Sequence, residues 1–252
     1  MPVDPAHRLI FALDVATAAE AHRLVATLHD AVRFYKVGLE LFLAAGFPLV
    51  DRLLEQDKQV FLDLKLYDIP ETVARAVRQI RTRPITFTTV HGDDAILHAA
   101  CRERGEVGIL AVTVLTSLDR RGLEELGITI DVHDLVLARA RRAAQAGCTG
   151  VIASAQEARR IKESCGASLA VVTPGIRPAE NRPADDQKRV MTVEEAIDSG
   201  SDHLVVGRPI RDAADPYAAA VRIQESIHAA LAQRKGREER LPAGAPPGDA
   251  QA

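Results

Sequence analysis

One stretch of the chain, residues 60–81, reads VFLDLKLYDIPETVARAVRQIR and holds a complete strand–loop–helix unit. Val60–Leu64 is short and apolar, as buried strands are. Asp68-Ile69-Pro70 has the form of a helix start, because an acidic N-cap candidate precedes a proline near the first helical position. Thr72–Arg81 continues with a helical pattern. We expect units of this kind to build the whole fold.

Similar units recur along the chain at fairly even spacing. The candidate strands are Leu9–Leu13, Phe34–Val37, Val60–Leu64, Ile85–Val90, Ile109–Val114, Gly150–Ala153, Leu169–Val172 and Leu204–Val206. Helical stretches lie between them, among them Ala18–Leu28, Leu41–Leu54 and Leu135–Ala146. Strands that alternate with helices imply parallel pairing, and eight units within residues 1–233 predict an α/β fold, a single (β/α)8 TIM barrel. A doubly wound sheet is the alternative, but no Gly-x-Gly-x-x-Gly turn follows the first strand.

Capping signals mark several helix starts. Thr17-x-x-Glu20, Ser154-x-x-Glu157 and Thr192-x-x-Glu195 have the form of capping boxes, and Asp215-Pro216 opens the last helix. Residues 234–252 are charged and then rich in Pro, Gly and Ala. We expect them to form a disordered C-terminal tail, since they cannot bury enough apolar surface to become ordered.

The composition limits the classes of function. The 252 residues are 47% hydrophobic and 27% charged, with a formal net charge of −3. This balance argues against a general nucleic-acid or anionic-membrane binder, so any anion site must be local. Cys101, Cys148 and Cys165 lack metal-like spacing. Together with the lack of a signal-peptide pattern and of a run of roughly 18 apolar residues, they favour a cytoplasmic location.

Polar residues stand near most of the predicted strand ends, where the chemistry of a barrel gathers. They are Asp14, Lys36, Asp63, Lys65, Asp68, Thr113, Thr116, Ser154, Arg177 and Arg208, the last preceded by Gly207. Only six of the 32 basic residues are lysine, yet Lys36 and Lys65 are placed at strand ends among apolar neighbours. Lysine can lend a proton because its pKa moves readily, whereas arginine stays charged. These two lysines are therefore candidate catalytic groups.

Asp63 and Lys65 are two residues apart, so in a strand they project to the same face, above Phe61. A charged pair is costly to bury unless each charge has partners. Lys36 and Asp68 are available to complete a Lys–Asp–Lys–Asp array. Two plainer interpretations stay open: Asp68 caps the third helix, or Asp63 and Lys65 form an ordinary ion pair.

The loops after the last two strands predict a phosphate site, because those loops commonly bind phosphate in this fold. Gly207 lets its backbone N–H approach an anion closely, and Arg208 can bind it through two hydrogen bonds. The long loop Ile176–Val190 carries Gln187 and the basic residues Arg177, Arg182, Lys188 and Arg189. We expect this loop to act as a flap that closes over a charged ligand.

These motifs together resemble the orotidine 5′-monophosphate decarboxylase family. The matching pieces are Leu13-Asp14, Lys36–Gly38, Phe61–Thr72, Ala111–Ser117, Ser154–Glu157, Val172–Pro178, Gln187 and Val206–Pro209. The Asp-x-Lys-x-x-Asp core is shared with related sugar-phosphate barrels, but its combination with Thr-Pro-Gly-Ile-Arg-Pro and Gly-Arg-Pro is highly specific. One departure is Gly92-Asp93-Asp94-Ala95, where the family often has a small residue and paired glycines. We expect it to affect only local packing or the pocket rim.

The resemblance implies a cofactor-independent lyase that converts orotidine 5′-monophosphate to UMP and carbon dioxide, the last step of de novo pyrimidine biosynthesis. It implies that Lys65 donates a proton to C6 of the pyrimidine and that Asp63 holds Lys65 in position. Lys36 would brace Asp63 and reach the ribose. Neither a metal nor an organic cofactor is expected.

Further roles follow from the same resemblance. The implied substrate contacts are Asp14 at the ribose, Ser154 at the pyrimidine edge, Thr116 elsewhere on the substrate, and Arg177, Gln187, Gly207 and Arg208 at the phosphate. The resemblance also implies a homodimer in which Asp68 and Thr72 act in the partner's site. Two other functions stay open: a magnesium-dependent sugar-phosphate barrel enzyme, such as a hexulose-phosphate synthase or a keto-gulonate phosphate decarboxylase, and a catalytically silent nucleotide-binding module.

Overall fold

The computed structural model describes residues 3–177 and 191–240. Its centre is a closed barrel of eight parallel strands, which follow one another around the barrel in chain order. The strands are β1 (Leu9–Ala12), β2 (Phe34–Gly38), β3 (Gln59–Leu66), β4 (Phe87–Val90), β5 (Gly108–Val112), β6 (Gly150–Ile152), β7 (Ala170–Thr173) and β8 (His203–Val206). Closure confirms the predicted barrel and excludes the open doubly wound sheet.

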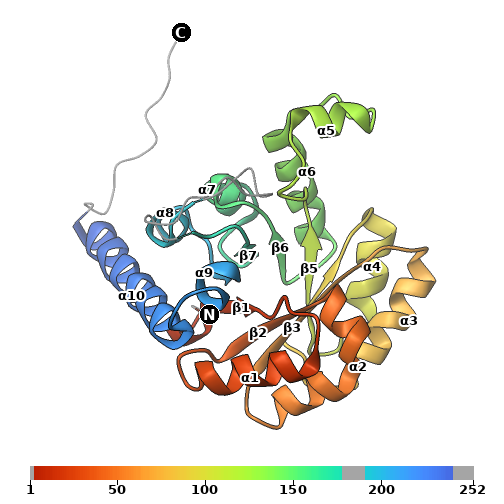
Figure 1. Cartoon of the computed structure of the whole chain (residues 1–252). Coiled ribbons are helices and arrows are strands. Elements are labelled where there is room, and N and C mark those ends of the chain that lie inside the picture. The colour runs from red at the N-terminus through yellow and green to blue at the C-terminus, as the bar shows by residue number, and fades with distance from the viewer. Residues whose placement is uncertain (1–2, 178–190, 241–252) are drawn as a thin grey trace.

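At least one α-helix follows each strand, and the helices surround the barrel (Figure 1). After a short 3₁₀ turn, η1 (Pro5–His7), the helices are α1 (Ala18–Leu28), α2 (Leu39–Leu54), α3 (Pro70–Ile80), α4 (Asp94–Glu103), α5 (Arg120–Glu125), α6 (Val132–Gln145), α7 (Ala155–Cys165), α8 (Val193–Asp198), α9 (Arg208–Arg211) and α10 (Pro216–Arg240). Within the described residues, no helix has the length and apolar character needed to cross a bilayer.

The last helix is longer than the sequence analysis expects. Helix α10 continues to Arg240, so residues 234–240 are helical rather than part of a disordered tail. Arginine, lysine and glutamate are good helix formers. Arg234 also donates to the carbonyl of Ile197, and Arg237 pairs with Asp198, so polar contacts with α8 hold a segment that has little apolar surface. Residues 241–252 of the predicted tail lie outside the described residues.

Helix starts use the capping residues that the sequence marks, although only one of the three predicted boxes is complete. Thr192 accepts from the N–H of Glu195, whose carboxylate accepts from the N–H of Thr192 in return. Thr17 and Ser154 cap their helices through the hydroxyl alone. Glu157 lies instead 3.0 Å from the ring of His133. Two of the predicted capping boxes therefore contain only the hydrogen bond that the N-cap hydroxyl accepts.

The Gly92–Ala95 turn is where helix α4 begins. Asp93 is the N-cap of α4 and accepts from the N–H of Ile96. Gly92 has φ +140°, and a Cβ there would lie 2.6 Å from Cδ1 of Ile96. The turn therefore favours a residue without a side chain at position 92.

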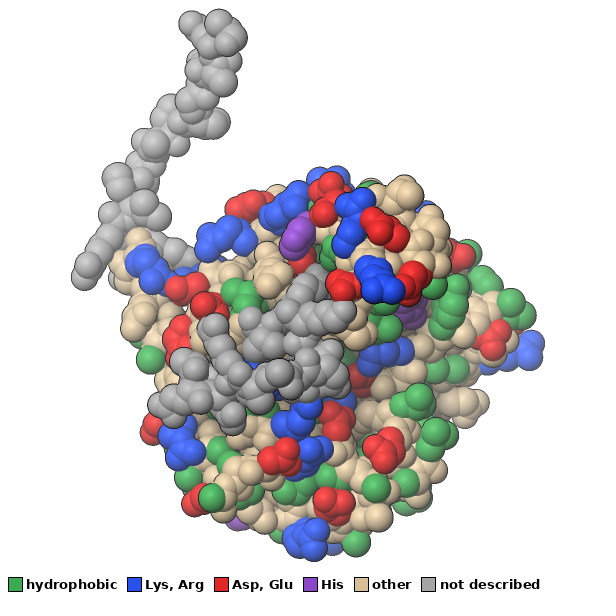
Figure 2. Space-filling model, turned by 45° about the horizontal axis from the view of Figure 1, so that its top comes forward, with side chains coloured by type: hydrophobic (Ala, Val, Ile, Leu, Met, Phe, Trp, Pro, Cys, Tyr) green, Lys and Arg blue, Asp and Glu red, His purple; other side chains and the backbone are tan. Residues whose placement is uncertain are grey.

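The barrel interior is an apolar layer beneath the strand ends. It contains Ile10, Ala12, Phe34, Phe61, Phe87, Leu110, Val172 and Val205. Alternate residues of the same strands, such as Leu9 and Phe11 in β1, point outward into the core under the helices. On the face shown in Figure 2, charged side chains of both signs are interspersed. The apolar layer gives the strand-end residues above it a rigid floor.

Candidate active site

A pocket of ≈ 380 Å³ opens at the carboxyl ends of the strands. Its floor includes Phe61, Ile152 and Val205 from the interior layer. Its polar and glycine lining includes Asp14, Lys36, Asp63, Lys65, Thr116, Gly175, Arg177, Gly207, Arg208 and Arg211. The volume is within the range of small-ligand sites, and the mixture of an apolar floor with converging polar groups is typical of them.

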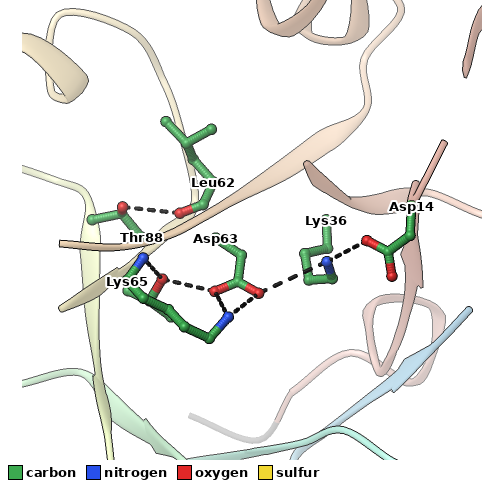
Figure 3. A network of polar contacts seen from close by, with 7 residues as sticks. Asp14, Lys36, Leu62, Asp63, Lys65 and Thr88 are labelled. Carbon is green, nitrogen blue, oxygen red and sulfur yellow. Dashed lines mark hydrogen bonds and ion pairs between the residues drawn. The ribbon is translucent and has the colours of Figure 1, made fainter. Parts of the chain in front are cut away.

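A chain of alternating charges crosses this pocket (Figure 3). The ammonium of Lys65 lies 2.7 and 2.8 Å from the two carboxylate oxygens of Asp63. On the other side, Nζ of Lys36 lies 3.8 Å from Asp63 and 2.8 Å from Asp14. Three of the four groups predicted for the array thus meet, and Asp14 takes the outer position.

The charges around Asp63 keep its carboxylate ionised. Its side chain is 11% exposed, and burial alone raises the pKa of a carboxyl group. The nearby charges of Lys36 and Lys65 and the hydrogen bonds from Lys65 and Thr89 outweigh that burial, so the pKa of Asp63 lies below its ordinary value. The pair is therefore more than a solvated surface contact: one anion is shared by two cations in a partly closed site.

The backbone at Lys65 is not that of a regular strand. Lys65 has φ +49°, and the pairing of β3 with β4 shifts register between Leu62 and Leu66. A left-handed conformation costs a non-glycine residue about 1 kcal/mol or more. Simple alternation predicted that Asp63 and Lys65 share a face. They do meet, but through this irregular backbone, and such strain is often found at functional sites.

The predicted phosphate end lies in the same pocket. Gly207 and Arg208 line it beside Arg177, which is buried and donates to the carbonyl of Ile176. A Cβ on Gly207 would lie 3.3 Å from the Cβ of Ala12, so a larger residue would be tightly packed there. Gln187 and the rest of the predicted flap from residue 178 to 190 lie outside the described residues.

Three predicted site residues do not line the pocket of their own chain. Asp68 is exposed and accepts a 2.6 Å hydrogen bond from the N–H of Ile69. The N-cap of α3 is Ile69, so the interpretation of Asp68 as the helix cap is wrong. Thr72 is exposed on α3. Ser154 is buried and accepts from the N–H of Gln156 at the start of α7.

Comparison with known proteins identifies the family. The model of the "Orotidine 5'-phosphate decarboxylase / HUMPS family" matches residues 7–223. The chain belongs to this family.

Relatives agree over nearly the whole length. The orotidine 5'-phosphate decarboxylase of Methylococcus capsulatus is 57% identical over 227 residues, which cover 90% of this chain and 94% of the relative. That of Rhodopseudomonas palustris is 48% identical and covers 91% and 97%. The crystal structure of orotidine 5'-phosphate decarboxylase from Lactobacillus acidophilus superimposes with a TM-score of 0.79 at 35% identity, covering 88% of this chain and 99% of that one.

Sequence reasoning missed two residues at this decarboxylase-family site. Arg211 lines the pocket and donates to the backbone carbonyl of Asp14 at 2.6 Å. Thr89 contacts Asp63 from within β4. A β-branched residue inside a strand resembles ordinary core, so Thr89 had no sequence signal, whereas Arg211 follows Gly207-Arg208 by one helical turn. In the described part of the chain, no three His, Cys, Asp or Glu side chains form a group that could hold a metal ion.

Proposed function

We propose that this protein decarboxylates orotidine 5′-monophosphate to UMP and carbon dioxide, the last step of de novo pyrimidine biosynthesis. The observation that carries the proposal is the Asp63 carboxylate placed between the ammonium groups of Lys65 and Lys36, in a pocket also lined by Arg177 and Arg208. The two lysines of the array and the two arginines suit a substrate that carries both a carboxylate and a phosphate. Membership of the family and the names of its relatives support the choice of substrate.

Lys65 is the proton donor in this proposal. When the bond from C6 to the carboxylate breaks, carbon dioxide leaves and the electron pair stays on C6. The ammonium of Lys65 stabilises this charge and gives C6 a proton. Neutral Lys65 then recovers its proton from water. Its side chain is 40% exposed, so it can reach both substrate and solvent.

The remaining residues of the pocket bind and align. Asp63 holds the ammonium of Lys65, while Lys36 braces Asp63 and, with Asp14, contacts the ribose hydroxyls. The phosphate is bound by Arg177, Gly207, Arg208 and Gln187. The energy of this binding, remote from C6, drives closure of the loop over the phosphate and contributes to catalysis. Ser154 contacts the pyrimidine edge, and Thr116 contacts the substrate from the pocket lining. In this structure the hydroxyl of Ser154 caps α7, and Ser154 is not among the residues that line the pocket.

Asp68 and Thr72 complete the site of a partner subunit in a homodimer. Both are exposed and outside the pocket of their own chain. Next to Asp68, the apolar side chains of Tyr67 and Ile69 are 71% and 67% exposed, as expected of a surface that a second subunit covers. One short segment would then serve two active sites.

A spectrophotometric assay with orotidine 5′-monophosphate, run with and without EDTA, tests the activity. We expect turnover that EDTA does not change. Turnover that chelation abolishes would favour a magnesium-dependent sugar-phosphate enzyme, and binding of UMP without turnover would favour a silent nucleotide-binding module. Mixing inactive Asp68→Ala with inactive Lys65→Ala tests the dimer. Random exchange should restore about a quarter of the wild-type activity, because half of the dimers then hold one intact site.

A further inference from the structure

Thr89 joins two parts of the charged array from the neighbouring strand. It is fully buried in β4. Its hydroxyl donates to Oδ1 of Asp63 at 2.8 Å and accepts from the backbone N–H of Lys65 at 2.9 Å. One hydroxyl group therefore links the anion of the array to the main chain of the cation.

The direction of both hydrogen bonds is determined by chemistry. A backbone N–H can only donate, and an ionised carboxylate can only accept. The hydroxyl proton of Thr89 must therefore point at Asp63, while a lone pair receives the N–H of Lys65. Each bond restricts the other, so the rotamer of Thr89 is fixed by its two partners as well as by burial.

These contacts lie where the strand is least regular. The N–H that Thr89 accepts belongs to Lys65, whose backbone has φ +49° inside the register shift of β3. A residue in this conformation persists only where its surroundings hold it. Among the hydrogen bonds of the described residues, Thr89 provides one to the backbone of Lys65 and one to the carboxylate that fixes the Lys65 ammonium.

We propose that Thr89 is a positioning residue for decarboxylation: it holds the Asp63 carboxylate and the Lys65 backbone together, so that the Lys65 ammonium stays aligned with the substrate. This inference rests on the proposed function of the pocket. Thr89 does not line the pocket, so it acts through Asp63 and Lys65. It should therefore affect the rate of the reaction more than the binding of ligand.

The adjacent residue supplies a matched control. Thr88 is the same residue type, on the same strand, and is also fully buried. Its hydroxyl donates 2.9 Å to the backbone carbonyl of Leu62 and does not contact the array (Figure 3). Thr88→Val and Thr89→Val thus each remove one hydroxyl from a fully buried residue, but only Thr89→Val removes it from Asp63 and Lys65.

The experiment compares steady-state kinetics of the wild type, Thr89→Val, Thr89→Ser and Thr88→Val. We expect Thr89→Val to lower kcat by about 10- to 100-fold, since small displacements in an aligned site have effects of that size. KM and the Kd of UMP should stay within about threefold. Thr89→Ser, which keeps the hydroxyl, should recover most of kcat, and Thr88→Val should keep it. If Thr89→Val does not fold, Thr89→Ala against Thr89→Ser gives the same comparison.

Crystal structures of Thr89→Val and Thr88→Val separate this inference from the proposed function. A Thr89→Val structure that keeps Asp63 and Lys65 in place, or a kcat that equals that of Thr88→Val, overturns the positioning role even if the wild type is an active decarboxylase. Displacement of Lys65 in Thr89→Val alone, together with the kcat loss, supports it. A wild type without turnover of orotidine 5′-monophosphate rejects the proposed function and, with it, any role in decarboxylation.

Discussion

The barrel interior holds an ionisable group at each end, and the two groups differ in whether they carry a charge at pH 7. At the carboxyl end, Asp63 lies between Lys36 and Lys65, and its pKa is below the ordinary value because these charges and hydrogen bonds outweigh burial. At the amino end, His203 packs against the rings of Phe34 and Phe87 and donates from Nδ1 to the carbonyl of His7. Burial there lowers the pKa of His203 to about 4.

The difference shows what a closed barrel requires in order to hold a charge. The nearby carboxylate of Asp202 raises the pKa of His203, but burial outweighs it, so the imidazole is neutral at pH 7. An ion in an apolar interior is unfavourable unless counter-charges lie close to it. The carboxyl end, the proposed catalytic end, holds an ionised carboxylate, and the two lysines Lys36 and Lys65 supply its counter-charges. At the amino end the buried histidine stays neutral instead.

The largest effect should follow from removing the proposed proton donor, Lys65. We expect Lys65→Ala to lower kcat by about 10⁴-fold or more, because both the proton donor and the charge that stabilises C6 are lost. Binding of UMP should persist, since Arg177 and Arg208 are untouched. Steady-state kinetics and calorimetric titration with UMP measure the two quantities.

Lys58→Ala is the matched control for this prediction. Lys58 is also a scarce lysine, but it donates to the backbone carbonyls of His29 and Val32, away from the pocket. It should keep nearly full turnover. Near-normal kcat in Lys65→Ala would mean that the acid lies elsewhere and that the charged end of the barrel only binds substrate.

The next effect should come from removing the shared anion. Asp63→Asn leaves the ammonium groups of Lys36 and Lys65 facing each other without a carboxylate between them. We expect a loss of about 3 kcal/mol in the free energy of unfolding at pH 7, the low end for breaking a buried pair, because Lys65 is 40% exposed. Urea denaturation measures it. An Asn variant as stable as the wild type would show that water already screens the array.

The amino end should respond to a different pH range. The unfolded chain binds a proton at His203 below about pH 6.5, whereas the folded chain binds it only below about pH 4. Stability from this group is therefore lost as the pH falls from 6.5 to 4, by up to about 3 kcal/mol. The contribution of Asp63 is present above pH 3.8 and is lost only as the pH falls through its lower folded pKa.

His203→Asn tests this assignment. The amide keeps a donor near the carbonyl of His7 but does not titrate, so the variant should lose less stability than the wild type between pH 6.5 and 4. Urea denaturation at several pH values gives the slopes, and the difference in slope is the result of interest, since the smaller side chain lowers stability at every pH. Equal slopes would place the acid sensitivity on other groups.

The sequence predicted what depends on repetition and on strand-end chemistry. The alternation of strands and helices predicted the barrel. The two-residue spacing of Asp63 and Lys65 and the strand-end position of Lys36 predicted that their side chains meet. The scarcity of lysine does not by itself identify catalytic residues. Lys162, for instance, donates to the carbonyls of Ala167 and Leu169 and pairs with Asp202, so a structural role also selects lysine.

Contacts between strands were beyond the reach of the sequence. The φ of +49° at Lys65 depends on how β3 pairs with β4, and no local pattern in residues 60–66 reveals it. Thr89 is a site residue only because register places it behind Asp63. Helix α10 was underestimated because the contacts of Arg234 and Arg237 with α8 are tertiary. The cytoplasmic location and the cofactor-free reaction stay predictions.

The smallest effect on stability should come from the outer carboxylate of the array. Asp14 also pairs with Lys36 at 2.8 Å, but it is 53% exposed, whereas Asp63 is 11% exposed. Exposed ion pairs contribute between 0 and about 1 kcal/mol, so Asp14→Asn should change the free energy of unfolding by less than about 1 kcal/mol. Its effect should appear in KM instead, since Asp14 is proposed to bind the ribose and an amide there is a weaker acceptor. Urea denaturation and steady-state kinetics of Asp14→Asn beside Asp63→Asn make the comparison. If Asp14→Asn is as destabilised as Asp63→Asn, burial does not determine how much an ion pair contributes to the free energy of unfolding at this end of the barrel. The contrast with His203 then loses its physical basis.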